Sequence, residues 1–167
     1  MGTSSIIGRL IPTGWEGRLC SYDGHPDHQG RVLFEAVTSH FASDVDAARG
    51  YFIDDHPAGW SYLGGDFTKP TGHLPPGYLA SQSEPDERNQ CYCHGDRHDP
   101  PAPLITHRGP LPWTDYGYLL GDDNLTMLVP AHASLWAVAE VDWSAAPDWD
   151  DLSVRLRHGT SHPLRLP

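Results

Sequence analysis

The sequence predicts an α+β fold, in one domain: a mainly antiparallel sheet with two helices on one face and a long irregular central loop. Length, composition and the pattern of apolar residues lead to this prediction. The chain has 167 residues, enough for one domain with a buried core, and its 17 glycines and 16 prolines exclude a long-helix protein. Strand-like segments lie near both ends of the chain, and a helical repeat of apolar residues lies between them.

Two short segments of β-compatible sequence open the chain. Residues 4–11 read SSIIGRLI and residues 17–23 read GRLCSYD. Between them lies Pro12-Thr13-Gly14-Trp15, a turn-rich connector of hairpin length. The pattern predicts two strands joined by a connector that includes Trp15.

The helical repeat begins at Asp27, which we expect to cap the first helix. The apolar stripe of this helix follows the spacing i, i+3, i+4, i+7, i+8: Leu33, Ala36, Val37, His40 and Phe41. A second helix follows Ser43, with Asp44 as its cap, and Pro57 ends it.

Residues 64–112 are the predicted irregular loop. They contain nine of the sixteen prolines and very few aliphatic residues. An irregular segment of this length is uncommon inside a compact domain, so we expect it to be functional, cross-linked or mobile.

Strand signals return after the loop. Residues 116–120 and 125–129 flank a Gly-Asp-Asp-Asn turn and predict a second hairpin. Alternating apolar residues over 135–143 predict a further strand. The same alternation at Leu152, Val154 and Leu156 predicts a last strand.

Charge and cysteine content narrow the class of protein. The formal net charge is −11, so nonspecific nucleic-acid binding is not expected, because an acidic surface repels phosphate. The three cysteines, the absence of a signal-peptide pattern at the start and the lack of a long apolar stretch predict a cytoplasmic protein with reduced thiols and no membrane contact.

One segment carries a resemblance to a known group of proteins. The chain reads Cys20-Ser-Tyr-Asp-Gly-His-Pro, three residues, Gly30-Arg31, then an aliphatic run ending in Glu35. It resembles uncharacterised small phage and bacterial proteins whose early segment reads His-Trp-Asp-Gly-Tyr-Pro, three residues, Gly, Lys or Arg, aliphatic run, Glu. The opening MGTSS, residues 60–64 and residues 95–97 are similar to other elements of that family.

The resemblance implies a phage-associated or actinobacterial origin and supports the fold, but it brings no activity. This sequence departs from the family pattern at Ser21 and His25, where the family has a histidine and an aromatic residue.

The same segment predicts an anion site where a strand ends and a helix begins. Helix-start N–H groups, a flexible glycine and an arginine together suit an anionic ligand such as a nucleotide. We expect the 64–112 segment to close over the ligand. The candidate ligand-binding residues are Tyr22, Asp23, Gly24, His25, Gly30, Arg31, Asp96 and Arg97. The alternative is a structural Asp-Gly turn with an Arg31–Glu35 pair.

A second candidate site lies within eight residues of the loop. Cys91, Cys93, His94 and His98 supply two thiols and two imidazoles, the ligand types that suit Zn²⁺. A metal would explain how a loop with few apolar residues stays ordered. The alternative is a solvated histidine-rich loop without metal.

These sites lead to three functional hypotheses. The first is a cytosolic protein that binds a small anionic ligand at the strand-to-helix loop. The second is a zinc-dependent hydrolase that uses the Cys/His loop. The third is an acidic interaction or inhibitor protein of phage–host conflict, whose partner is a host protein.

Overall fold

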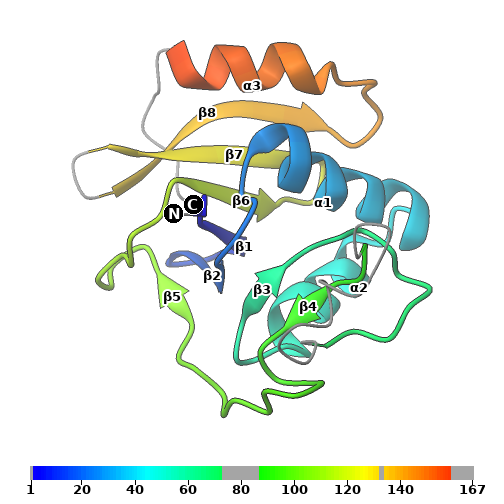
Figure 1. Cartoon of the computed structure of the whole chain (residues 1–167). Helices are drawn as coiled ribbons and strands as arrows, with labels where there is room; N and C mark the ends of the chain where they lie inside the picture. Colours follow the sequence, from blue (N-terminus) through cyan, green and yellow to red (C-terminus); the bar gives the residue numbers. More distant parts are fainter. Residues whose placement is uncertain (1, 73–86, 132–133, 159–167) are drawn as a thin grey trace.

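The computed structural model describes residues 2–72, 87–131 and 134–158. Its centre is an eight-stranded sheet in the order β4-β3-β2-β1-β6-β7-β8, with β5 also paired to β2 (Figure 1). The strands are β1 (Ser5–Ile11), β2 (Gly14–Cys20), β3 (Trp60–Tyr62), β4 (Gln90–Cys91), β5 (Ile105–Thr106), β6 (Tyr116–Leu120), β7 (Asn124–Ala131) and β8 (Ser134–Asp142).

The sheet is mixed and mostly antiparallel. The chain-adjacent pairs β1–β2, β6–β7 and β7–β8 are antiparallel, as are β2–β5 and β3–β4. The pairs β1–β6 and β2–β3 are parallel, because the chain returns to the sheet after long excursions. The predicted α+β class is confirmed, with two parallel pairs inside the sheet.

The first hairpin is tighter than predicted. Ile11 pairs with Gly14 and Leu10 with Trp15, so the connector is only Pro12-Thr13 and Trp15 belongs to β2. The ring of Trp15 is 2% exposed and packs in a hydrophobic cluster. Burial of a large indole surface favours extending the strand through this position.

Two helical runs lie where the apolar period predicts them. The first joins a π-type turn (Pro26–Gly30), α1 (Arg31–Glu35) and a second π-type turn (Ala36–His40); the second joins α2 (Val45–Arg49) to a π-type turn (Gly50–Asp54). Asp44 caps α2 as predicted, accepting from the Ala47 N–H at 2.9 Å. Asp27 does not cap the first run, because Pro26 opens the helix and places Asp27 inside its first turn.

The predicted last strand is wrong: residues 149–158 form α3 (Trp149–His158). Leu152 and Leu156, one helical turn apart, are buried, whereas Val154 is 60% exposed. The side chain of Asp148 accepts from the Asp151 N–H at 3.0 Å and starts the helix. Among the described residues, this face of the sheet therefore carries three helices and not two.

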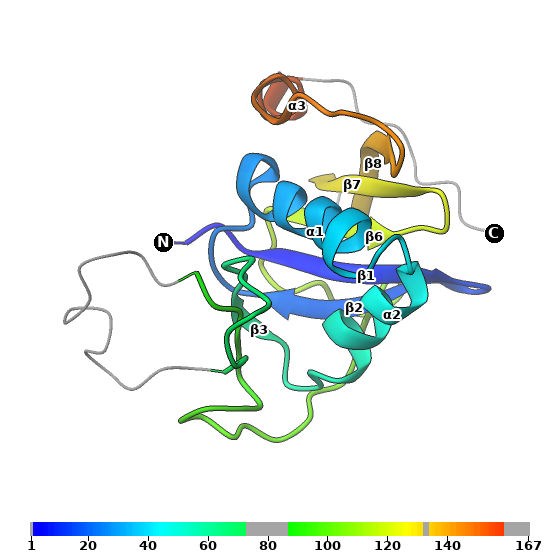
Figure 2. The same cartoon turned by 90° about the vertical axis from the view of Figure 1, so that its right-hand side faces the viewer.

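All three helices contribute to one core. It joins Ile7, Tyr118 and Met127 of the sheet to Val37 of the first run and Leu152 of α3. Figure 2 shows α1 and α2 lying over the strands, with α3 beyond β8. A smaller cluster on the opposite face is packed by Ile105 and Leu111.

The predicted irregular loop contains short regular elements. Its described parts, residues 64–72 and 87–112, include β4, β5 and an isolated bridge between Asp66 and Arg88. Residues 73–86 lie outside the described part of the chain.

Candidate metal centre

Two segments that lie far apart in the sequence meet beside β3. His56 follows the second helical run, and its carbonyl accepts from the Gly59 N–H at 3.0 Å. Cys91 lies on β4, paired with Trp60 of β3. The Tyr92 N–H donates to the Gly59 carbonyl at 3.0 Å, so pairing of the strands holds the turn after β4 against residues 56–59.

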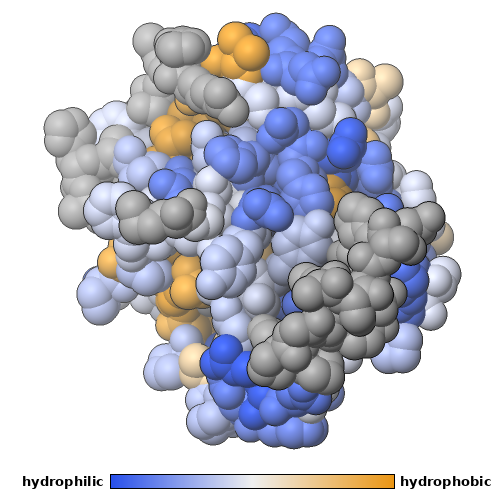
Figure 3. All heavy atoms as spheres, in the orientation of Figure 1, coloured by the Kyte–Doolittle hydropathy of each residue, from blue (hydrophilic) through white to orange (hydrophobic). Residues whose placement is uncertain are grey.

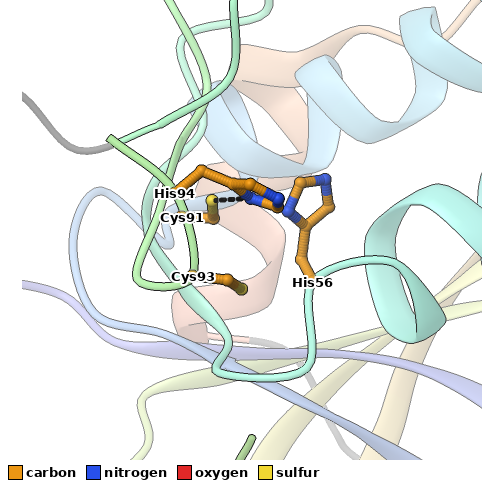
Figure 4. A group of neighbouring side chains, drawn as sticks. All are labelled: His56, Cys91, Cys93 and His94. Atoms are coloured by element: carbon orange, nitrogen blue, oxygen red, sulfur yellow. Dashed lines mark hydrogen bonds between the residues drawn. The ribbon is translucent and has the colours of Figure 1, made fainter. Parts of the chain in front are cut away.

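This pairing gathers four metal-ligating side chains. One ligand atom from each of His56, Cys91, Cys93 and His94 lies within 4.8 Å of the other three (Figure 4). Cys91 Sγ is 3.1 Å from His94 Nδ1. The rings of His56 and His94 are 5.1 Å apart and nearly perpendicular. The group could hold a metal ion.

His56 is suited to act as a neutral ligand. It is 5% exposed, and its Nδ1 is buried without a hydrogen-bond partner among the described residues. Burial, with a smaller contribution from His94, lowers its pKa to about 4. The ring is therefore uncharged at neutral pH and keeps a free lone pair for a metal.

The two thiols lie among backbone N–H donors. Burial raises the pKa of Cys91 to about 11, while N–H groups of Cys93 and His94 act in the opposite direction. The Ala58 N–H donates to Cys93 Sγ at 3.4 Å. A metal replaces the thiol proton on binding, and N–H···S bonds then stabilise the resulting thiolates.

Three of the four predicted ligands are brought together, and the fourth position differs. His98 is exposed, has a left-handed backbone with φ of 51°, and is not part of the group. His56, and not His98, is the fourth member of the group. Local spacing around residues 91–98 gives no signal for His56, but zinc sites usually draw ligand pairs from two segments, which would have directed attention to histidines outside the loop.

Gly24, His25 and Gly30 have structural contacts in the fold. The Gly24 N–H donates to the Thr3 carbonyl at 2.9 Å, and His25 Nε2 lies 2.6 Å from Thr3 Oγ1. Gly30 is buried, and a Cβ there would lie 3.2 Å from the ring of Trp149. Close packing of α3 accounts for this glycine.

The other candidates for the anion site are on the surface. Tyr22 is 52% exposed, and Asp23 and Arg31 are exposed, with Asp23 in a left-handed conformation at φ 55°. The guanidinium of Arg97 pairs with Asp99 and lies 4.5 Å from the ring centre of Tyr92.

Tyr92 connects the turn that carries Arg97 to the end of β2. Its hydroxyl donates to Ser21 Oγ at 2.8 Å, while Asp96 is exposed beside Arg97. Anion binding at the strand-to-helix loop stays a prediction.

Comparison with known proteins leaves the chemistry of the site as the main guide to function. Models of protein families, curated proteins and solved structures gave no match to this chain. None of the described helices combines the length and the apolar character needed to cross a bilayer.

Proposed function

We propose that this protein binds one zinc ion through His56, Cys91, Cys93 and His94. The observation that carries the proposal is the convergence of four ligand atoms, from two segments, within 4.8 Å of one another. Two thiolates and two imidazoles form a common zinc ligand set, and soft sulfur ligands favour zinc over magnesium or calcium.

The distances are compatible with a tetrahedral ion. Bonds of about 2.3 Å to sulfur and about 2.0 Å to nitrogen place neighbouring ligand atoms roughly 3.3 to 3.8 Å apart. The widest separation of 4.8 Å then requires a contraction of about 1 to 1.5 Å. Cys91 Sγ and His94 Nδ1 already lie 3.1 Å apart, and His94 is exposed, so its side chain is free to adjust.

The proposed role of the ion is structural. It would tie the turn after β4 to residues 56–59, next to a Pro-rich segment with few apolar residues. Zinc binding free energy then replaces part of the hydrophobic burial that such a segment lacks. Four protein ligands fill a tetrahedral ion, whereas a zinc hydrolase keeps one position open for water, so the structural role is favoured over hydrolysis.

Zinc content of two matched histidine variants tests the proposal. Purified wild-type protein, loaded with Zn²⁺ and freed of excess, should retain about one equivalent by elemental analysis. His56→Ala should retain less than about a tenth of that amount, and His98→Ala should retain the full amount.

Cys20→Ala serves as the thiol control, because Cys20 is buried outside the group. Equal zinc content in His56→Ala and wild type would overturn the proposed ligand set. Loss of zinc from His98→Ala would point instead to the single-segment set that the sequence predicts.

A further inference from the structure

A second chemical feature lies on the other side of residues 56–59. Arg18 on β2 is only 9% exposed. Its Nε donates to the Ile53 carbonyl at 2.9 Å and its Nη1 to the Ala102 carbonyl at 2.5 Å. Both partners are neutral backbone groups, so these bonds orient the guanidinium without neutralising it.

The two carboxylates that act on the charge of Arg18, Asp54 and Glu16, both bind another arginine. Arg9 binds Glu16 through Nη2 at 2.8 Å and Asp54 through Nη1 at 2.6 Å. Arg18 itself forms no ion pair with the described carboxylates, and its Nη2 makes no hydrogen bond to any described residue. Two carboxylates are thus shared between two arginines, and Arg18 has no hydrogen-bonded anion of its own, a position that an anionic ligand would fill.

Arg18 lines a pocket of about 450 Å³. The size lies in the range of small-molecule sites, in which apolar walls surround a few polar groups that orient the ligand. Hydrophobic residues appear on the side of the molecule where β5 lies (Figure 3). The residues that matter to the argument are Arg18, Ala58, Gly59, Pro103, Ile105 and Leu111.

We propose that this pocket binds a small monocarboxylate with an apolar body, such as an aromatic or fatty acid, whose carboxylate pairs with Arg18. The guanidinium presents parallel N–H donors that match a carboxylate. Arg18 is the only charged residue among those that line the pocket. A single cation among aliphatic and proline side chains suits one negative charge on an apolar body better than a phosphate, which needs more donors.

The metal centre and the pocket share one wall. Ala58 and Gly59 line the pocket, and the Ala58 N–H binds Cys93 Sγ. Zinc content is therefore measured on every sample used for ligand binding, and the Arg18 variant should contain as much zinc as wild type. This separates failure of the pocket proposal from failure of the metal proposal.

Calorimetric titration with 2-naphthoate tests the pocket, with the neutral 2-naphthamide as the matched probe. Wild type should bind 2-naphthoate with a Kd of about 1 mM or tighter. Binding of the amide should be at least about tenfold weaker, because the charge-assisted contact is lost.

Arg18→Gln should weaken 2-naphthoate binding at least about tenfold, while Arg108→Gln should stay within about twofold of wild type. Arg108 is an exposed arginine that lines a neighbouring hollow and not this pocket. Should Arg18→Gln fail to fold, Leu111→Trp fills the pocket without removing the cation and should abolish binding. Three outcomes would overturn the proposal. They are equal affinity of wild type for 2-naphthoate and 2-naphthamide, wild-type affinity of Leu111→Trp for 2-naphthoate, and no saturable binding of 2-naphthoate to wild type.

Discussion

The backbone N–H of Ala58 lies 3.4 Å from Sγ of Cys93, to which it donates a hydrogen bond. The two residues are 35 positions apart, so this contact joins the segment after the second helical run to the turn after β4. Hydrogen bonds of this kind stabilise a thiolate and orient it for a metal. The fold thus places a thiol of the candidate metal centre beside a backbone N–H donor.

Removal of zinc should destabilise the protein. A structural ion present at about 1,000 times its Kd contributes about 4 kcal/mol, and each kcal/mol shifts the Tm of a chain of this length by about 2 to 4 °C. We therefore expect a chelator to lower the Tm by about 8 to 16 °C in differential scanning calorimetry. Cys93→Ser should melt at the lower temperature with and without chelator. A wild-type Tm that does not change when chelator is added would contradict a structural ion.

Zinc binding should release about two protons at neutral pH. Burial raises the pKa of Cys91 to about 11, so its thiol is protonated before binding, and Cys93 must also become a thiolate to ligate. His56, with a pKa lowered to about 4, is already neutral and releases none. Zinc affinity should fall about 100-fold for each unit of acidification near neutral pH. Calorimetry in buffers of different ionisation enthalpy counts the protons, and a count near zero would exclude thiolate ligation.

Gly30→Val should loosen α3. A Cβ at position 30 would lie 3.2 Å from the Trp149 ring and 3.3 Å from Tyr118, so a branched side chain has no room. Overpacking of this kind costs about 1 to 3 kcal/mol. Gly50→Ala is the matched control: Gly50 is helical with nothing within 4 Å of a Cβ, and alanine should stabilise by about 0.5 to 1 kcal/mol. Equal urea midpoints for Gly30→Val and wild type would contradict the packing of α3.

Val37→Asp should unfold the protein or cost more than about 3 kcal/mol, because it places an unpaired carboxylate in the main core. Ser39→Asp, two residues along the same helical run and exposed, should change stability by less than about 0.5 kcal/mol. Circular dichroism melts compare the two. Similar Tm values would mean that the buried face of this helix is misplaced.

The sequence predicts most of the sheet and both central helical runs, because their periods extend over several residues. The prediction of the last element is wrong because Leu152, Val154 and Leu156 have the spacing of a strand. Leu152 and Leu156, four residues apart, also have the spacing of a helix. The residue that caps the segment distinguishes a helix from a strand. Asp148 followed by Trp149-Asp150-Asp151 is a helix start, and three alternating apolar residues are too few to outweigh it.

The residues of the candidate metal centre likewise differ in whether local sequence predicts them. Cys91, Cys93 and His94 are close in sequence, so spacing finds them. His56 is brought to them by the β3–β4 pairing of Trp60 with Cys91 and by the hydrogen bond from Ala58 to Cys93. These contacts are tertiary, and local sequence reasoning assigned the fourth position to His98, the next histidine along the loop.

The visible absorption spectrum of the Co²⁺-substituted wild-type protein tests the central claim most directly, because cobalt reports the geometry and the ligand type of the ion that it replaces. One equivalent of Co²⁺ should give the intense visible bands of a tetrahedral ion together with thiolate-to-cobalt charge transfer, and Zn²⁺ should abolish both. A weak octahedral spectrum without thiolate charge transfer would contradict a centre made by His56, Cys91, Cys93 and His94.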